Sequence, residues 1–348
     1  MTIRITVKRL VLALLALGIG GLLFAWSGLF QVAASSGHWA VTDWLLHWTM
    51  RNSVRTHAAL GKPIDPPADV LDGKGLISAA GHYRQACQIC HGAPGVRPSA
   101  VMQRATPPAP DLAKLGDKWT GRQLGWIIEH GVKMTGMPAW GAEGRRDEVA
   151  RMTAFVQHLP GMTAEDYDAL TEEVPPTDIP GVRPGVLAAC TGCHGADGRG
   201  RGQADIPILG GQSPAYLRQT MADFASGRRS SAVMQVAVAA LSSEEMDRLA
   251  RHFASMPGLN VAGAVTHPLL EKGAPSRQLP ACAGCHAPGK PNPAIFGQKP
   301  AYIAARLRHW HGDDTVVDAL KPSDTMATIA RRVPANAIDE LAHAIAGK

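Results

Sequence analysis

The chain has 348 residues, of which 45% are hydrophobic and 18% are charged, a composition typical of a globular protein with two or three domains. The net charge is only +6, and no segment is basic enough to indicate nucleic-acid binding. Aromatic residues make up only 5% of the chain, so we expect the cores to pack against another large apolar group.

The first 34 residues predict a membrane anchor. Three basic residues precede an uncharged apolar run over 10–30, which is close to the roughly 20 residues needed to span a bilayer as a helix. Basic flanks stay cytoplasmic, so the rest of the chain is expected in the periplasm, at the bacterial inner membrane. The alternative is a cleaved signal peptide, because Val32-Ala33-Ala34 fits a cleavage site, although signal cores usually have only about 7–15 residues.

Residues 35–72 are expected to connect the anchor to the body of the protein. Thr42 is a suitable cap for a helix that runs to about Leu60, and prolines after it predict a stiff connector. One side of this helix carries Val41, Trp44, Leu45 and Trp48. Tryptophans beside a membrane span often lie at the lipid–water interface. The other interpretation is an ordinary amphipathic helix that packs on the first globular domain.

Three units of similar plan follow, over 73–175, 176–262 and 263–348. Each begins with a short helix, continues through a loop region rich in glycine and proline, and ends with a closing helix. The closing helices are expected over 147–159, 243–255 and 335–346. Proline-bearing stretches mark the boundaries between units. No alternating run is long enough to predict a strand, so the fold class is all-α, with three tandem domains after an N-terminal transmembrane helix.

Local signals support two of the closing helices and a duplication. Ser242 and Glu245 have the spacing of a capping box, and Pro334 suits a first-turn position. The segment 211–216, Gly-Gln-Ser-Pro-Ala-Tyr, matches 297–302, Gly-Gln-Lys-Pro-Ala-Tyr. The second and third units are therefore predicted to be repeats of one another.

All six cysteines occur in Cys-x-x-Cys pairs, and a histidine follows each pair directly. This is the attachment sequence of c-type haem, in which two thiols add to the two vinyl groups of one porphyrin and the histidine ligates the iron. A zinc site with four ligands would leave one pair unused, and a thioredoxin-like pair needs a βαβ setting. We therefore expect three covalent c-type haems on Cys87, Cys90, Cys190, Cys193, Cys282 and Cys285, with proximal ligands His91, His194 and His286.

The distal iron ligand is expected to be a methionine in each unit, because a thioether opposite histidine closes the site and raises the reduction potential. Met326 is the only methionine after Cys285. The repeat favours Met234 in the second unit, with Met256 as the alternative. In the first unit the candidate is Met137, with Met134 as the alternative. Each candidate is expected in a loop before the closing helix, which disfavours the interpretation as core filler.

These motifs are similar to those of a known family. Each unit resembles a class I cytochrome c, and the second and third units together resemble the diheme cytochrome c-four group. The matching elements are the haem motifs, the repeated Gly-Gln-x-Pro-Ala-Tyr segments, Met234 and Met326. The first unit, with Thr135 to Trp140, resembles single-haem domains of bacterial respiratory cytochromes. The resemblance covers about residues 75–348 and implies two packed domains that pass electrons between their haems.

We interpret the chain as a periplasmic electron-transfer relay in a bacterial respiratory chain, which cycles iron between two oxidation states and makes no bonds. The alternative is a triheme subunit of a membrane-bound dehydrogenase or oxidase complex. A weaker alternative is a haem enzyme such as a peroxidase, for which no distal acid–base group is evident; His130, His309 and His311 are read as surface or propionate contacts. Expected partners are the inner membrane and a redox protein: a quinol-oxidising complex, a periplasmic dehydrogenase or a terminal oxidase.

Overall fold

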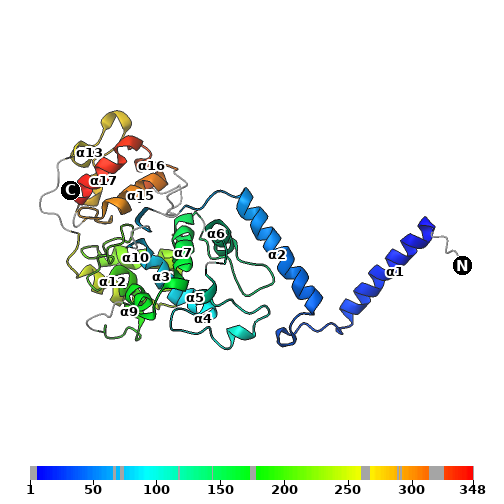
Figure 1. Ribbon diagram of the computed structural model, residues 1–348. Coiled ribbons are helices and arrows are strands. Elements are labelled where there is room, and N and C mark those ends of the chain that lie inside the picture. Colours follow the sequence, from blue (N-terminus) through cyan, green and yellow to red (C-terminus); the bar gives the residue numbers. More distant parts are fainter. Residues whose placement is uncertain are drawn as a thin grey trace.

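The computed structural model describes residues 6–65, 68–70, 74–116, 118–142, 144–172, 178–259, 267–287, 290, 292–312 and 325–347. Within these ranges the chain forms helices joined by turns and loops (Figure 1), and the β-pairing is confined to two isolated bridges, Ala93 with Val96 and Ala274 with Leu279. This confirms the all-α fold class.

Helix α1, Val7–Trp26, extends away from the body of the protein (Figure 1) and buries none of its residues. It is the one helix in the described ranges that is long and apolar enough to cross a membrane. The helix ends before the apolar run does, because Ser27 closes it and Gly28 takes a positive φ of 72°, a conformation that glycine adopts without a steric penalty. Residues 28–30 therefore lie outside the helix.

Helix α2, Ala40–Leu60, ends where the sequence predicts but begins earlier. The expected Thr42 cap is wrong, because Trp39 occupies the cap position without a side-chain hydrogen bond and Thr42 lies inside the first turn. The C-terminal half packs on the first unit, where Val54 and Ala58 are buried and the ring of His57 stacks on that of Trp126, with centroids 5.7 Å apart. The N-terminal half remains exposed.

The first unit has a core of buried aromatic rings. Tyr83 packs against both Phe155 and Tyr167, and all three rings are almost inaccessible to solvent. The closing helix α7 lies within one residue of the expected bounds. The helices of this unit are α3 Ile77–His82, α4 Gln88–His91, α5 Leu112–Leu115, α6 Gly121–His130, α7 Arg146–His158 and α8 Ala164–Thr171, and a π-turn, Tyr83–Cys87, joins α3 to α4.

The second unit packs α10 against α12 around Leu187, Leu217 and Phe253. The capping box of α12 is confirmed, since Ser242 accepts from the backbone N–H of Glu245 while the Glu245 carboxylate accepts from that of Ser242. The helices of this unit are α9 Val186–His194, α10 Pro214–Ala225, α11 Ala232–Val238 and α12 Ser243–Ala254.

The third unit contains α13 Pro268–Glu271, α14 Cys282–His286, α15 Pro300–Trp310, α16 Thr325–Ala330 and α17 Ile338–Ala346. The closing helix starts later than expected, because a 3-10 turn, Ala335–Ala337, precedes it and Pro334 caps that turn instead of entering the helix. Ile345 is buried in the core of this unit. The three units have separate cores, but their expected boundaries near 72, 175 and 262 lie outside the described residues, so the division into domains stays a prediction.

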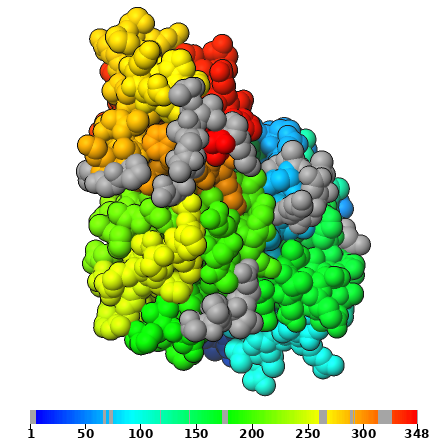
Figure 2. All heavy atoms as spheres, turned by 90° about the vertical axis from the view of Figure 1, so that its left-hand side faces the viewer, coloured from blue at the N-terminus to red at the C-terminus, as the bar shows by residue number. Residues whose placement is uncertain are grey.

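The third unit sits on the second through a reciprocal pair of glutamines from the repeated segments. Gln298 donates to the carbonyl of Ile208 at 3.1 Å and accepts from its N–H at 2.9 Å. Gln212 makes the same two bonds to Ala294, at 2.8 and 3.0 Å. Figure 2 shows this stacking, with the orange-to-red third unit above the green second unit. The duplication therefore produces a nearly symmetric interface.

The first unit packs beside the second through α3, which contacts both α9 and α11. Gly81 on α3 permits this approach, because a Cβ atom there would lie only 2.7 Å from the Cys193 sulfur. Polar contacts reinforce the interface: the buried side chain of Gln203 bonds to the N–H and hydroxyl of Ser78 at 2.9 and 2.8 Å. The second unit thus lies between the first and the third.

Candidate functional site

Each Cys-x-x-Cys-His motif ends a helix: α4 ends at His91, α9 at His194 and α14 at His286. Both cysteines of the second motif, Cys190 and Cys193, line a cavity, whereas in the other two motifs only the first cysteine, Cys87 or Cys282, does so. All six are free, and burial raises the pKa of both Cys87 and Cys190 to about 12. Among the described residues, no group of three or more His, Cys, Asp or Glu is arranged to hold a metal ion.

Backbone carbonyls orient two of the three motif histidines, His91 and His286. Nδ1 of His91 lies 2.9 Å from the carbonyl oxygen of Pro110, and Nδ1 of His286 lies 2.8 Å from that of Pro293. Such a contact makes Nδ1 the donor and leaves Nε2 to bind a metal. Burial lowers the pKa of His194 to about 4, so its ring is neutral, the form that ligates iron.

In the first unit the structure brings Cys87, His91 and Met137 together around one small apolar cavity. The N–H of Met137 donates to the Thr135 hydroxyl at 3.1 Å, which fixes the turn before Pro138. The alternative, Met134, is 84% exposed and does not line the cavity. The geometry therefore favours Met137 as the candidate ligand.

The second and third motifs open onto one shared cavity of about 1140 Å³. This exceeds the roughly 300–1,000 Å³ of an ordinary small-molecule site. The alternative ligand Met256 is not among its lining residues, whereas Met234 and Met326 are. The remaining motif residues on its wall are Cys190, Cys193, His194, Cys282 and His286.

One expectation about the methionines is wrong. Met137 lies in a loop as predicted, but Met234 lies in α11 and Met326 in α16. In α11 the Ser231 hydroxyl accepts from the N–H of Met234 at 3.1 Å and so starts a helix at that point. The sequence interpretation overlooked this cap because the helix has only seven residues.

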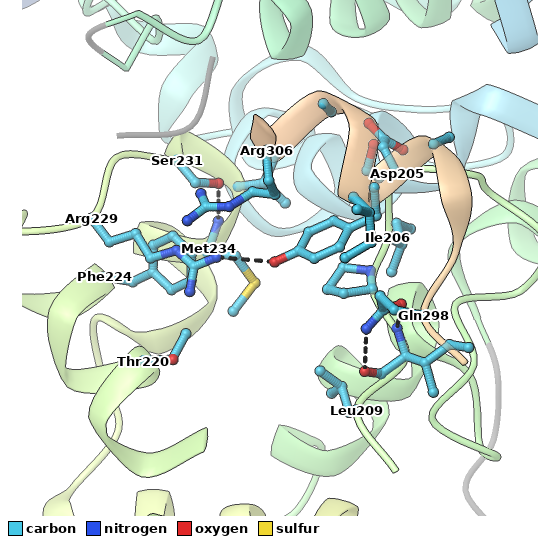
Figure 3. A pocket seen from close by; sticks show the side chains of 18 of the residues that line it. Asp205, Ile206, Leu209, Thr220, Phe224, Arg229, Ser231, Met234, Gln298 and Arg306 are labelled. Atoms are coloured by element: carbon cyan, nitrogen blue, oxygen red, sulfur yellow. Dashed lines mark hydrogen bonds between the residues drawn. The ribbon is translucent and has the colours of Figure 1, made fainter. Parts of the chain in front are cut away.

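A cluster of two arginines and two tyrosines, Arg229, Arg306, Tyr216 and Tyr302, lines the large cavity, and the sequence did not predict a role for it. Figure 3 shows the two arginines. Arg229 donates to the Tyr302 hydroxyl at 3.2 Å. Burial and the charge of Arg229 lower the pKa of Arg306 to about 10. Burial alone would raise the pKa of Tyr216, but the charges of Arg229 and Arg306 outweigh it and lower that pKa.

This cluster suits carboxylates, because buried guanidinium groups are strong partners of anions. The repeat is a sequence signal that would have found Tyr216 and Tyr302. The arginines occupy positions that are not duplicated, yet each stacks on the aromatic residue of its repeat, Arg229 over Phe224 and Arg306 over Trp310. The cavity thus combines apolar walls, paired thiols, imidazole and thioether groups with an anion-binding corner, which together fit haem and its propionates.

The other histidines lie away from these cavities, with one exception. His130 is about half exposed, and Nε2 of His311 lies 2.6 Å from the carbonyl oxygen of Val333. The exception is His82, which sequence reasoning missed. It lines the first cavity, is 5% exposed and packs edge-on against Trp140, and burial lowers its pKa to about 4.

Comparison with known proteins is consistent with these features. The family model "Cytochrome C oxidase, cbb3-type, subunit III" matches residues 76–156. A thiosulfate dehydrogenase electron acceptor from Stutzerimonas stutzeri is 35% identical over 175 residues, which are 47% of this chain and 79% of the relative. Cytochrome c4 from Pseudomonas aeruginosa is 32% identical over 134 residues, covering 34% of this chain and 65% of the relative.

Among solved structures, reduced recombinant cytochrome c4 from Pseudomonas stutzeri aligns with 47% of this chain and 95% of its own, at 28% identity and a TM-score of 0.41. The two relatives described above are electron-carrying cytochromes, and the similarity to the thiosulfate dehydrogenase electron acceptor extends over most of that protein. The chain therefore belongs to the cytochrome c family, whose members hold haem covalently.

Proposed function

We propose that this protein is an electron-transfer relay that carries three covalent c-type haems. The observation that supports it is that the histidine and at least one cysteine of each Cys-x-x-Cys-His motif line the same internal cavity as the candidate methionine of that unit. Electron transfer as the general role agrees with the relatives, which are electron-acceptor cytochromes and cytochromes c4.

Haem, when bound, supplies an iron that gains and loses one electron. In the proposed arrangement the cysteines would hold the haems covalently, and His91, His194 and His286 would be the proximal iron ligands. Met137, Met234 and Met326 would be the distal ligands, and their thioethers would exclude small molecules from the iron. Arg229 and Arg306 bind the propionates, and the apolar walls keep water away, which raises the reduction potential.

The number of haems is tested directly by a pyridine haemochrome assay on acid–acetone-extracted, fully matured protein. We expect three haems per chain, and two or fewer would contradict the proposal. Replacement of Cys87, Cys190 or Cys282 by alanine should in each case weaken the attachment of one haem or lose that haem, because one of its two thioethers is then missing.

We further propose that α1 anchors the protein in the bacterial inner membrane and that the exposed half of α2 lies at the lipid–water interface. Trp44 and Trp48 stack on each other and are 61% and 51% exposed. Trp39 contacts Phe30, which in turn contacts Phe24 of α1, so an aromatic chain links the two helices. Tryptophan is enriched at this depth of a membrane, and the haem units would then lie in the periplasm.

A dehydrogenase is the electron donor that we favour, because one relative is named as the electron acceptor of thiosulfate dehydrogenase. The match of residues 76–156 to a subunit of cbb3-type oxidase favours a terminal oxidase as the acceptor, reached through the first unit. Co-purification of the native membrane complex tests both partners. Fast binding of about one equivalent of carbon monoxide to the unmodified ferrous protein would contradict full His/Met ligation and favour a haem enzyme instead.

A further inference from the structure

A side chain of the first unit holds the helix that carries Met234 in the second. Glu148 is the third residue of α7. Its Oε1 accepts from the Ser231 hydroxyl at 2.5 Å, and its Oε2 accepts from the N–H of Ala232 at 2.8 Å. The same Ser231 hydroxyl accepts from the N–H of Met234 at 3.1 Å (Figure 3). Two consecutive hydrogen bonds that share the Ser231 hydroxyl oxygen thus connect Glu148 to the backbone of Met234.

The surroundings make this contact strong and specific. Ser231 is 2% exposed, and the Glu148 side chain is 11% exposed. Arg145 lies 3.0 Å from the Glu148 carboxylate and also donates to the carbonyl of Ser230 at 3.3 Å. Hydrogen bonds to a charged group are stronger than neutral ones, and leaving such a group without partners in a buried site is costly.

Helix α11 packs against α10 and α3, and Glu148 provides the side-chain hydrogen bonds from the first unit to its first turn. The helix has seven residues, and Val238, at its far end, is the one that is buried. So short a helix is not stable by itself, so its position depends on its contacts. Glu148 lines both the first cavity and the large one, so it lies where the sites of the first and second units meet.

Within the described residues, neither Met137 nor Met326 is positioned by a carboxylate from a neighbouring unit. Met137 bonds to Thr135 of its own unit. In the sequence, Ser323 precedes Met326 by three residues, as Ser231 precedes Met234, so a local hydroxyl is shared by the repeats. Among the described residues, a carboxylate from a neighbouring unit is bonded at the start of the helix that carries Met234 and not at the turn that carries Met137.

We infer that Glu148 is a positioning residue for the distal ligand of the second unit. By holding the first turn of α11 it sets the distance of the Met234 thioether from the iron, so docking of the first unit tunes the potential of the second. The inference rests on the proposed ligation by Met234. A weaker iron–sulfur bond stabilises the ferrous state less and lowers the reduction potential.

The test uses full-length, haem-loaded protein with Glu148→Gln and Ser231→Ala, and with Glu244→Gln as the matched control. Glu244 lies in the first turn of α12, and its side chain is 70% exposed, so the control makes the same charge change away from the cavities. Three quantities are measured: the weak far-red absorption of methionine-ligated ferric haem, the individual reduction potentials, and carbon monoxide binding. Haem content and circular dichroism identify any variant that fails to fold.

In Glu148→Gln and Ser231→Ala we expect the far-red absorption to fall by as much as a third, which is the share of one of the three haems. One reduction potential should also fall, and one iron should bind carbon monoxide. Glu244→Gln should change none of these quantities. Wild-type values in Glu148→Gln and Ser231→Ala would overturn the inference. Met234→Ala separates this failure from that of the proposed function. If that substitution leaves the band intact, the ligand assignment itself is wrong and the positioning role falls with it.

Discussion

The interface between the second and third units should depend on Gln298. Its side chain is 2% exposed and satisfies both the N–H and the carbonyl of the buried residue Ile208. Gln298→Ala leaves these two groups without partners. A buried polar group without a partner costs about 1–3 kcal/mol, and water admitted into the vacated space recovers part of that cost. We therefore expect a loss of about 2–4 kcal/mol in the free energy of unfolding.

The measurement is a guanidinium titration of the haem-loaded protein followed by circular dichroism and by haem absorption. Gln219→Ala is the matched control, because Gln219 is exposed on α10 and bonds only to Asp223 on its own helix. We expect the control to change the unfolding free energy by less than about 0.5 kcal/mol. Equal denaturation midpoints for Gln298→Ala and Gln219→Ala would refute the reasoning. Gln212→Ala, which removes the symmetry-related pair of bonds, should resemble Gln298→Ala.

Three further predictions concern ligation, acid stability and membrane attachment. Replacement of Met326 should remove about a third of the far-red absorption and let carbon monoxide bind, because no other methionine follows Cys285 to replace it; an unchanged spectrum would exclude Met326 as a ligand. Hydrogen bonds from Arg183 lower the pKa of Glu245 from 4.5 to about 2. The stabilisation that this carboxylate contributes is thus complete above about pH 4.5 and is lost as the pH falls toward about 2. In an acid titration, Glu245→Gln should therefore lose less unfolding free energy than the wild-type protein across that pH window. Parallel stability curves for the two proteins would argue against this role of the Glu245 carboxylate. The protein should stay in the membrane fraction through high-salt washing, since the run over 10–26 in α1 is uncharged; soluble protein with Ser35 at its N-terminus would instead establish cleavage.

The sequence by itself determined the local features. Cys-x-x-Cys-His is a contiguous motif whose chemistry depends on its own spacing, so the motif residues were evident without a structure. The closing helices were predicted to within a few residues, because apolar periodicity and the Ser242–Glu245 capping box act over one or two turns. The predictions failed where competing local signals were weak, as at Thr42 and Pro334, where the chain begins the turn at a different residue.

The tertiary structure decided which residues from distant segments meet. The sequence favoured Met137 but left Met134 open as the alternative, and only packing turns Met134 outward and Met137 to the cavity. Arg229, Arg306 and Glu148 look like surface residues in the chain, because charged side chains usually are. They are buried here because units far apart in sequence close over them and provide partners that no local pattern encodes.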